Sequence, residues 1–338
     1  MSRILFITYP AYGHVAPALA VADVLLAQGH QIAWVTGGQV EYVTQELQMT
    51  GIQVYLSSSF DLSPELVRDA EQGKNITVEL FFNPARIQCE VEDGRHAIND
   101  FRPEVIVTDE THGAKIVAEL AQLPWAQILI NSLTIPGVKI SNRSWIKPSR
   151  LKLALLNLAL WMVMKYGHRY NYAINHVRKK YGLPPLDSSG VQSVLSPQLN
   201  IIPSIPEFEQ ILLKENCQNI YFVGELLRDR VLGAPSLPWL EEFTKRHPVV
   251  YVTQGTSLKR PELFKMALQA FIQLDVQVVM TTGFQMNRDV LLASPIPSNV
   301  RIEQWISHQD ILPFTDAMVF PGGFSSSIGA LFHGVPQV

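Results

Sequence analysis

Short apolar runs alternate with helical patterns along most of the chain. The first run, ILFI at residues 4–7, leads into a Tyr-Pro-Ala-Tyr-Gly turn and then into a helical pattern from Pro17 to Gln28 that Gly29 ends. Short, continuous apolar runs are typical of strands that are buried on both faces of a parallel sheet. The order strand, loop, helix therefore predicts an α/β fold.

The same alternation recurs through the first two thirds of the chain. Strands are predicted at residues 32–35, 105–108 and 126–130 and near Val54, with helices to about Met49 and from Ala114 to Leu123. Pro124 ends the last of these helices. Parallel strands joined by helices form an open sheet with helices on both faces, so we expect one doubly wound domain over residues 1–224.

A second domain is predicted after a break in this pattern. The stretch from Gly224 to Pro248 carries three prolines and one short helical segment, and we place an interdomain linker at residues 225–247. Further strands are predicted at residues 249–253, 276–281, 300–302 and 317–320, with a helix from Pro261 to about Gln273. The chain stops at Val338, directly after a helix and a Gly-Val-Pro turn that should lead into another strand. We therefore expect the second domain, residues 248–338, to be incomplete.

Composition narrows the classes of function. The 338 residues are 47% hydrophobic and 17% charged, which excludes a disordered or coiled-coil chain. A formal net charge of −3 gives no basis for binding nucleic acid. Cys89 and Cys217 lie far apart without CxxC spacing, so neither a disulfide framework nor a metal site is predicted, and we expect a reducing, cytoplasmic location.

Two polar residues follow predicted strands of the first domain. His14 comes after the first strand and Asp109 after VIVT, and the carboxyl ends of parallel strands meet at one edge of a sheet. A neutral imidazole there could act as a general base, with the carboxylate fixing its tautomer. Alternatively, His14 is a capping or surface residue and Asp109 caps a helix that starts near Gly113. His112 is a second candidate base.

A glycine- and serine-rich turn in the second domain is the best candidate for binding phosphate. The chain has no GxGxxG or Walker A motif, but PGGFSSS at residues 321–327 lies between a predicted strand and a predicted helix. Backbone amides at a helix start favour an anion. The alternative is an ordinary turn in which the serines cap the helix.

Three segments carry a resemblance to a known family. The stretch YPAYGHVAPALAVADVLLAQGHQIAWVT resembles the start of the UDP-glycosyltransferase and macrolide-glycosyltransferase family, in which a short first strand leads to a GHxxP loop. VVYVTQGTS resembles the family's strand that ends in a Gly-Ser/Thr pair. NVRIEQWISHQDILPFTDAMVFPGGFSSSIGALFHGVPQV resembles its donor-binding signature, in register from Trp305 to Pro336. Residues 135–220 match only in general character.

The resemblance implies a GT-B fold, with two Rossmann-like domains facing across a cleft. The acceptor would bind mostly to the first domain and the nucleotide sugar mostly to the second. Transfer would be inverting and independent of metal, with a UDP- or dTDP-hexose as donor substrate and no further cofactor. His14 would take the proton from the attacking acceptor hydroxyl, and Asp109 would orient His14 and compensate its charge.

The resemblance also implies a set of donor-binding residues. Trp305 would stack on the base, the backbone of Ile306 would bond the base edge, and the remaining residues would hold the diphosphate: Thr256, Gly322, Gly323, Ser325 and Ser326. The chain departs from the family's pattern at three positions: the phosphate-binding histidine is Pro321, the ribose-binding glutamate is Gly329, and a glutamine is His308. The family's Asp-Gln pair would lie beyond Val338.

The segment at residues 143–169 allows two interpretations. It places six basic residues around an apolar centre at 153–164, which is too short to span a membrane because a bilayer needs ~20 apolar residues. It could be an interfacial helix in peripheral contact with a membrane. We favour a helix that lines a hydrophobic acceptor pocket.

These observations predict a glycosyltransferase that moves a hexose to a hydroxyl of an apolar small molecule. A second hypothesis is a non-catalytic GT-B relative, a binding or accessory protein that has lost donor-site residues. A third is a GT-B nucleotide-sugar epimerase, which the GHVAP loop and the order of the signature disfavour.

Overall fold

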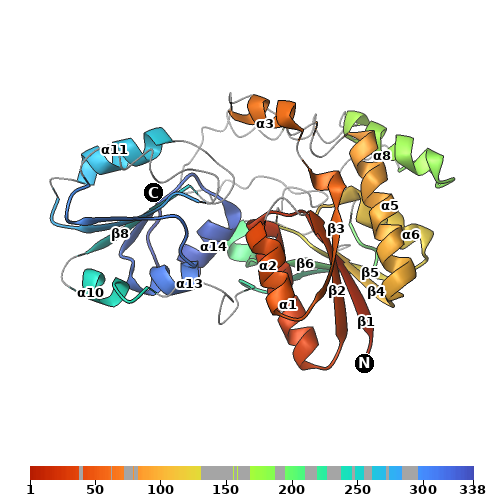
Figure 1. Cartoon of the computed structure of the whole chain (residues 1–338), viewed down its shortest axis with the longest axis horizontal. Helices are drawn as coiled ribbons and strands as arrows, with labels where there is room; N and C mark the ends of the chain where they lie inside the picture. The colour runs from red at the N-terminus through yellow and green to blue at the C-terminus, as the bar shows by residue number, and fades with distance from the viewer. Residues whose placement is uncertain are drawn as a thin grey trace. The chain divides into compact units, whose positions relative to one another are not determined.

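The computed structural model (Figure 1) contains two compact units, each built around a parallel sheet. Unit 1 comprises Met1–Pro10 and His14–Leu226, and unit 2 comprises Ala11–Gly13 and Leu227–Val338. The structure describes residues 1–37, 41–61, 63–71, 79, 83–130, 155, 158, 168–186, 195–209, 219–226, 237–245, 248–254, 261–271, 274–283 and 296–338.

The sheet of unit 1 has seven strands, all parallel. They are β1 (Arg3–Ile7), β2 (Gln31–Gly37), β3 (Gln53–Ser57), β4 (Val105–Thr108), β5 (Trp125–Ile128), β6 (Leu199–Ile202) and β7 (Ile220–Phe222). Their order is β3-β2-β1-β4-β5-β6-β7, with Ile4 of β1 opposite Ile32 on one side and Val105 on the other. The chain changes direction across the sheet between β1 and β4, and ligands of open α/β sheets bind outside the carboxyl ends of such neighbours.

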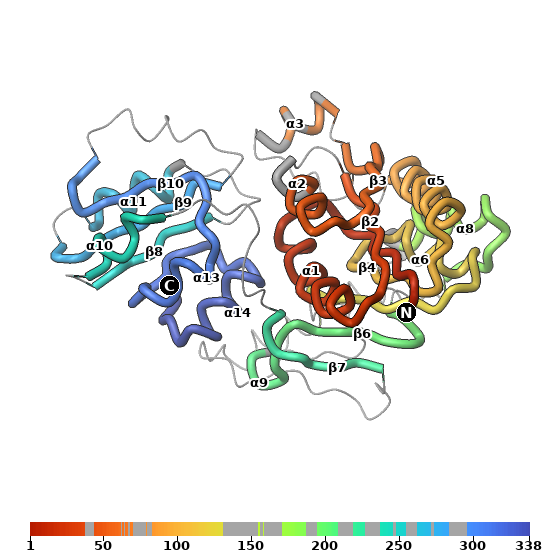
Figure 2. Tube along the Cα trace, turned by 60° about the horizontal axis from the view of Figure 1, so that its bottom comes forward, coloured from red at the N-terminus to blue at the C-terminus, as the bar shows by residue number. Residues whose placement is uncertain are grey.

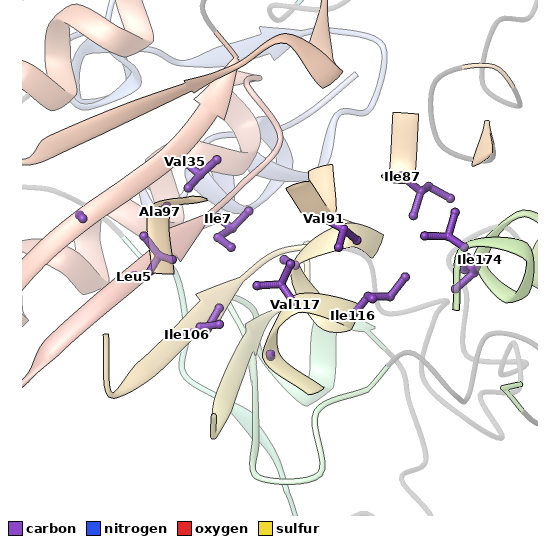
Figure 3. Close-up of a cluster of buried hydrophobic side chains, with 14 of the residues drawn as sticks. Leu5, Ile7, Val35, Ile87, Val91, Ala97, Ile106, Ile116, Val117 and Ile174 are labelled. Atoms are coloured by element: carbon purple, nitrogen blue, oxygen red, sulfur yellow. The ribbon is translucent and has the colours of Figure 1, made fainter. Parts of the chain in front are cut away.

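Helices cover both faces of this sheet, which confirms the predicted α/β, doubly wound architecture (Figures 1 and 2). One face packs against α1 (Tyr12–Ala27) and α2 (Glu41–Met49), and the other against α5 (Pro84–Phe101), α6 (His112–Leu120) and α8 (His168–Lys180). Figure 3 shows the second of these cores, in which Leu5, Val91 and Val117 come from a strand and two helices. Shorter elements of this unit are η1 (Ser58–Phe60), α3 (Pro64–Glu71) and α9 (Pro206–Glu209).

Helix α1 begins earlier than its sequence indicates. The pattern predicts a start at Pro17 and places His14 on a loop, but the helix begins at Tyr12 and contains Pro17. Pro17 removes the bond that an N–H there would have donated to the carbonyl of Gly13, and its ring crowds that carbonyl, yet the helix continues through it. His14 is therefore fixed by helical geometry.

Unit 2 contains a four-stranded parallel sheet in the order β10-β9-β8-β11. Its strands are β8 (Val249–Thr253), β9 (Gln277–Thr281), β10 (Val300–Glu303) and β11 (Ala317–Val319). Its helices are α10 (Leu240–Thr244), α11 (Pro261–Phe271), α13 (His308–Ile311), η4 (Leu312–Phe314) and α14 (Phe324–Phe332). Alternate residues of β8 enter different cores: Tyr251 packs with α13 and α14, whereas Val252 packs with α11. After α14 the chain makes a parallel bridge from Gln337 to Met318 of β11.

In the part of the chain that the structure describes, no helix combines the length and apolar character needed to span a membrane.

Candidate active site

The carboxyl ends of β1 and β4 bring His14 and Asp109 together. His14 is the third residue of α1, which follows β1, and Asp109 is the first residue after β4. Nδ1 of His14 lies 2.8 Å from Oδ2 of Asp109, although the two residues are 95 positions apart. The side chain of Asp109 is 1% exposed and that of His14 is 14% exposed, so the imidazole alone retains access to solvent.

Asp109 is held by donors on both of its carboxylate oxygens. Oδ2 accepts the N–H of Tyr9 at 2.8 Å in addition to the contact with His14. Oδ1 accepts the N–H of Thr111 at 2.8 Å and also its hydroxyl group. The backbone carbonyl of Asp109 accepts from Nε2 of Gln127 on β5 at 3.0 Å. These bonds fix the carboxylate before any ligand binds.

The electrostatics of the pair favour a proton on Nδ1 of His14. Burial acts to lower the pKa of His14, but its hydrogen bond to Asp109 and the charges of Asp109 and Glu110 outweigh burial and raise it. Burial acts to raise the pKa of Asp109, but the bonds from His14, Thr111 and Tyr9 outweigh it and lower the pKa. An ionised carboxylate only accepts, so Nδ1 must donate. In the neutral ring, Nε2 then carries the lone pair that a general base needs.

His112, the second candidate base, has a different environment. It is the first residue of α6. Burial, together with the charge of Lys115, lowers the pKa of His112 to about 3. Its imidazole is therefore neutral at physiological pH, because the charge of Asp109, which acts to raise the pKa of His112, does not outweigh burial. His14 is the better placed of the two for proton transfer.

Asp109 does not cap α6 in the manner considered from the sequence. The N-cap residue is Thr111, and its side chain makes no capping bond because its hydroxyl donates to Asp109. The cap comes instead from α5: Oε2 of Glu90 accepts the N–H of Gly113 at 2.8 Å. Sequence reasoning did not single out Glu90, Tyr9 or Thr111.

The predicted donor-binding residues that the structure describes follow the carboxyl ends of two strands of unit 2, β10 and β11. Trp305 is the second residue after β10 and is half-buried, while the side chain of Ile306 is 2% exposed and packs in the core, so only its backbone could serve a ligand. Gly322 has a φ of +84°, and Gly323 is the N-cap of α14 with no side-chain capping bond. Ser325 and Ser326 lie in the first turn of α14, where helical N–H groups have no partners within the helix.

The three departures from the family's pattern also have clear positions. Pro321 is exposed beside Gly322 and has no N–H. Gly329 is buried on α14, so a glutamate there would meet the core rather than solvent. His308 is the first residue of α13, and burial with the nearby His333 lowers its pKa to about 4. Thr256 and most of the segment at 143–169 lie outside the described residues.

Comparisons with known proteins show which families the chain resembles. Residues 265–338 match the family model described as the C-terminal domain of erythromycin biosynthesis protein CIII-like proteins. The whole chain is 29% identical to 4'-demethylrebeccamycin synthase from Lentzea aerocolonigenes, of which it covers 82%. It is 25% identical, over 99% of the chain and 78% of the relative, to the NDP-glycosyltransferase YjiC of Bacillus subtilis (strain 168).

A solved structure shares the fold over the full chain. The glycosyltransferase SsfS6 of Streptomyces sp. SF2575, complexed with thymidine diphosphate, has a TM-score of 0.61 and 18% identity, covering 100% of this chain and 81% of that one. With the two parallel sheets, this likeness shows a GT-B fold.

The fold and its relatives define the class of the protein as a glycosyltransferase. Within that class, the matches support the macrolide-type UDP-glycosyltransferase family.

Proposed function

We propose that the protein transfers a hexose from a UDP- or dTDP-sugar to a hydroxyl of an apolar small molecule, with inversion and without a metal ion. His14 is the general base and Asp109 its partner. The observation that carries this proposal is the 2.8 Å contact between His14 and the buried Asp109 at the switch point of the unit 1 sheet.

In this mechanism Nε2 of His14 removes the proton from the acceptor hydroxyl as its oxygen attacks the anomeric carbon. The bond from that carbon to the diphosphate breaks in the same displacement, which inverts the configuration. Asp109 keeps Nδ1 protonated and stabilises the imidazolium that forms. The alcohol is deprotonated only as it attacks, so a positioned base is sufficient.

The leaving nucleoside diphosphate is assigned to unit 2. Gly322 and Gly323 expose the backbone before α14, and Ser325 and Ser326 follow in its first turn. Amides at a helix N-terminus stabilise negative charge that develops in the transition state. The thymidine diphosphate in the related SsfS6 structure supports a nucleoside diphosphate as the ligand.

The acceptor is assigned to unit 1, at the carboxyl edge of the sheet where the imidazole of His14 retains access to solvent. A cavity of about 630 Å³ lies beside α6 and α8, but its lining includes Trp125 and Gln198, at the amino ends of β5 and β6. The acceptor is therefore not assigned to that cavity. We expect residues 151–165 to contribute to acceptor binding rather than to a membrane contact, which cosedimentation with anionic vesicles would test.

The decisive experiment replaces His14 with alanine. We expect turnover to fall by ~10²–10⁴-fold with little change in nucleotide affinity, because general-base catalysis is lost while the donor site is intact. Release of UDP or dTDP over a panel of lipophilic alcohols and phenols measures turnover, and proton NMR of the product gives the anomeric configuration. His30→Ala is the control, because His30 lies in the turn before β2, where its Nδ1 accepts the N–H of Ser2.

Unchanged turnover in His14→Ala would remove His14 from the mechanism. A product with retained configuration would contradict inversion. Nucleotide binding without turnover for any acceptor would favour a non-catalytic relative.

A further inference from the structure

The start of α6 is held by a residue of another helix. The side chain of Glu90, on α5, is buried, and its Oε2 accepts the N–H of Gly113, the second residue of α6, at 2.8 Å. Helix N-terminal N–H groups are usually capped by the residue that precedes the helix. Here Thr111 occupies that position but gives its hydroxyl to Asp109, so the capping role passes to Glu90.

Gly113 makes this contact possible by having no side chain. A Cβ at residue 113 would lie 2.2 Å from Cβ of Glu90 and 3.0 Å from its backbone carbonyl carbon. A second glycine, Gly94, brings the same two helices together, since a Cβ there would lie 3.0 Å from Cγ2 of Val117. The two helices thus approach closely over more than one turn.

Residues 109–113 form one short segment between the end of β4 and the start of α6. Asp109 follows β4, Thr111 bonds it twice through N–H and hydroxyl, and Gly113 comes two residues later. The segment is fixed at one end by β4 and at the other by the Glu90 bond. Any shift of the first turn of α6 would therefore be passed through Thr111 to the carboxylate that orients His14.

We propose that Glu90 is a positioning residue for the His14–Asp109 pair, acting as a cap that holds α6, Thr111 and thereby Asp109 in place. The proposal rests on the proposed function only for its effect on turnover. Its effect on the His14 ring is independent of any activity. Glu90 acts without contacting substrate. Its role is to accept the hydrogen bond from Gly113 rather than to carry charge.

The groups around Glu90 are consistent with a structural acceptor rather than a permanent anion. The hydrogen bond from Gly113 favours the charge of Glu90, as do Arg86 on its own helix and Lys115 on α6, while Asp109 opposes it. Burial is the largest influence and raises the pKa of Glu90 to about 7. Tyr9, after β1, also lies within electrostatic range of Glu90.

The test compares three substitutions at one position. Glu90→Gln keeps a carbonyl oxygen at the same reach, Glu90→Asp keeps the charge but is one methylene shorter, and Glu90→Ala removes the acceptor. Glu92→Ala, an exposed glutamate on the same helix, is the control. The first readout is the nitrogen-15 NMR spectrum of the His14 imidazole, assigned by comparison with His14→Ala. The second is kcat and KM for the nucleotide sugar.

We expect Glu90→Ala and Glu90→Asp to lower kcat by about ten- to a hundredfold with little change in KM, because small misplacements of catalytic groups are costly. In both, the His14 spectrum should lose its single Nδ1–H tautomer. Glu90→Gln should restore both readouts. If Glu90→Ala fails to fold, the contrast between Glu90→Gln and Glu90→Asp still decides.

Two results would overturn the proposal. One is a wild-type His14 spectrum in folded Glu90→Ala or Glu90→Asp. The other is a loss in Glu90→Gln as large as that in Glu90→Asp, which would make charge the important property. If His14→Ala retained full turnover, the proposed function would fail, but the His14 spectra would still test the role of Glu90.

Discussion

Two strand-to-helix junctions, β4 to α6 in unit 1 and β11 to α14 in unit 2, leave their helix N-termini in different states. At the first, Thr111 and Asp109 bond each other and Glu90 caps the helix from α5. At the second, Gly322 and Gly323 precede the helix, and its N-cap residue, Gly323, has no side chain with which to cap it.

The difference indicates that the two junctions, although both connect a parallel strand to a helix, suit different chemical roles. A junction filled with side chains that are already bonded can hold a base in one tautomer. A junction of glycines leaves backbone N–H groups for an anion. Strand topology alone therefore does not decide which chemistry a junction supports, because the residues in the loop decide it.

The largest effect is expected from Asp109→Asn in the filled junction. Donors face both carboxylate oxygens, so one side of the amide must place its NH₂ group against an N–H donor. We expect kcat to fall by ~10²–10⁴-fold and the melting temperature to fall with it. Asp316→Asn is the matched control in unit 2, where Oδ2 of Asp316 accepts the N–H of Val249 at 2.8 Å. A wild-type kcat in Asp109→Asn would end the assignment of the pair.

A pH-dependent stability difference is expected for Glu90→Gln. The pKa of Glu90 lies at about 7 in the fold, above its ordinary 4.5, so its stabilising contribution is complete below about pH 4.5 and is lost as pH rises through 7. At pH 8 the wild type holds a buried charge that the amide lacks.

Glu90→Gln should therefore be more stable than the wild type at pH 8, by up to about 3 kcal/mol, and similar to it at pH 5. Urea unfolding at the two pH values measures this difference. Glu92→Gln, at an exposed position, should follow the wild type at both. If the difference in unfolding free energy between Glu90→Gln and the wild type were the same at pH 5 and pH 8, Glu90 would be ionised at both pH values.

A smaller effect is expected from Pro321→His in the glycine junction. Pro321 offers no donor, and a hydrogen bond to a charged group contributes ~1.5–3 kcal/mol. We expect UDP or dTDP to bind about tenfold more tightly or better, as measured by calorimetry. Pro313→His, at another exposed proline of unit 2, should leave affinity unchanged. Equal affinities in both variants would argue against phosphate binding at residues 321–327.

The smallest expected effect is a difference in stability between alanine substitutions at the two glycines of that junction, Gly322 and Gly323. Gly322 has a φ of +84°, which an alanine adopts at a cost of about 1 kcal/mol or more. Gly323 has a φ of −64°, and the nearest atom to an added Cβ is Oγ of Ser326 at 4.0 Å. Gly322→Ala should therefore unfold at lower urea concentration than Gly323→Ala. The reverse order would contradict the left-handed turn.

Much of the fold can be predicted from the sequence because its parallel strands are continuous apolar runs. VIVT at 105–108 and VVYVT at 249–253 are strands over those residues. In unit 1, the carboxyl edge that VIVT shares with β1 places His14 near Asp109. The start of α1 could not be predicted, because Pro17 usually marks the beginning of a helix.

Helix α5 and Glu90 could not be found in the same way. Much of α5 is polar, although Asn83 and Pro84 form an N-cap and first-turn pair that signals a helix start. Nothing local marks Glu90 as buried, because its burial depends on Gly113, which lies 23 positions away. A close contact between two helices that depends on a glycine forms only in the folded chain, so the local sequence around Glu90 does not reveal it.

The parallel pairing of β1 with β4 also has a consequence for synthesis on the ribosome. Ile4 pairs with Val105, so β1 lacks this neighbour until about 100 further residues have been made. At roughly 5–20 residues per second, that interval lasts on the order of 5–20 seconds. During it Leu5 and Phe6, which are fully buried in the finished protein, have only the β2 side of the sheet to pack against. The same closure brings Asp109 to His14, so the His14–Asp109 contact and the centre of the sheet would be completed in one late step of nascent-chain folding.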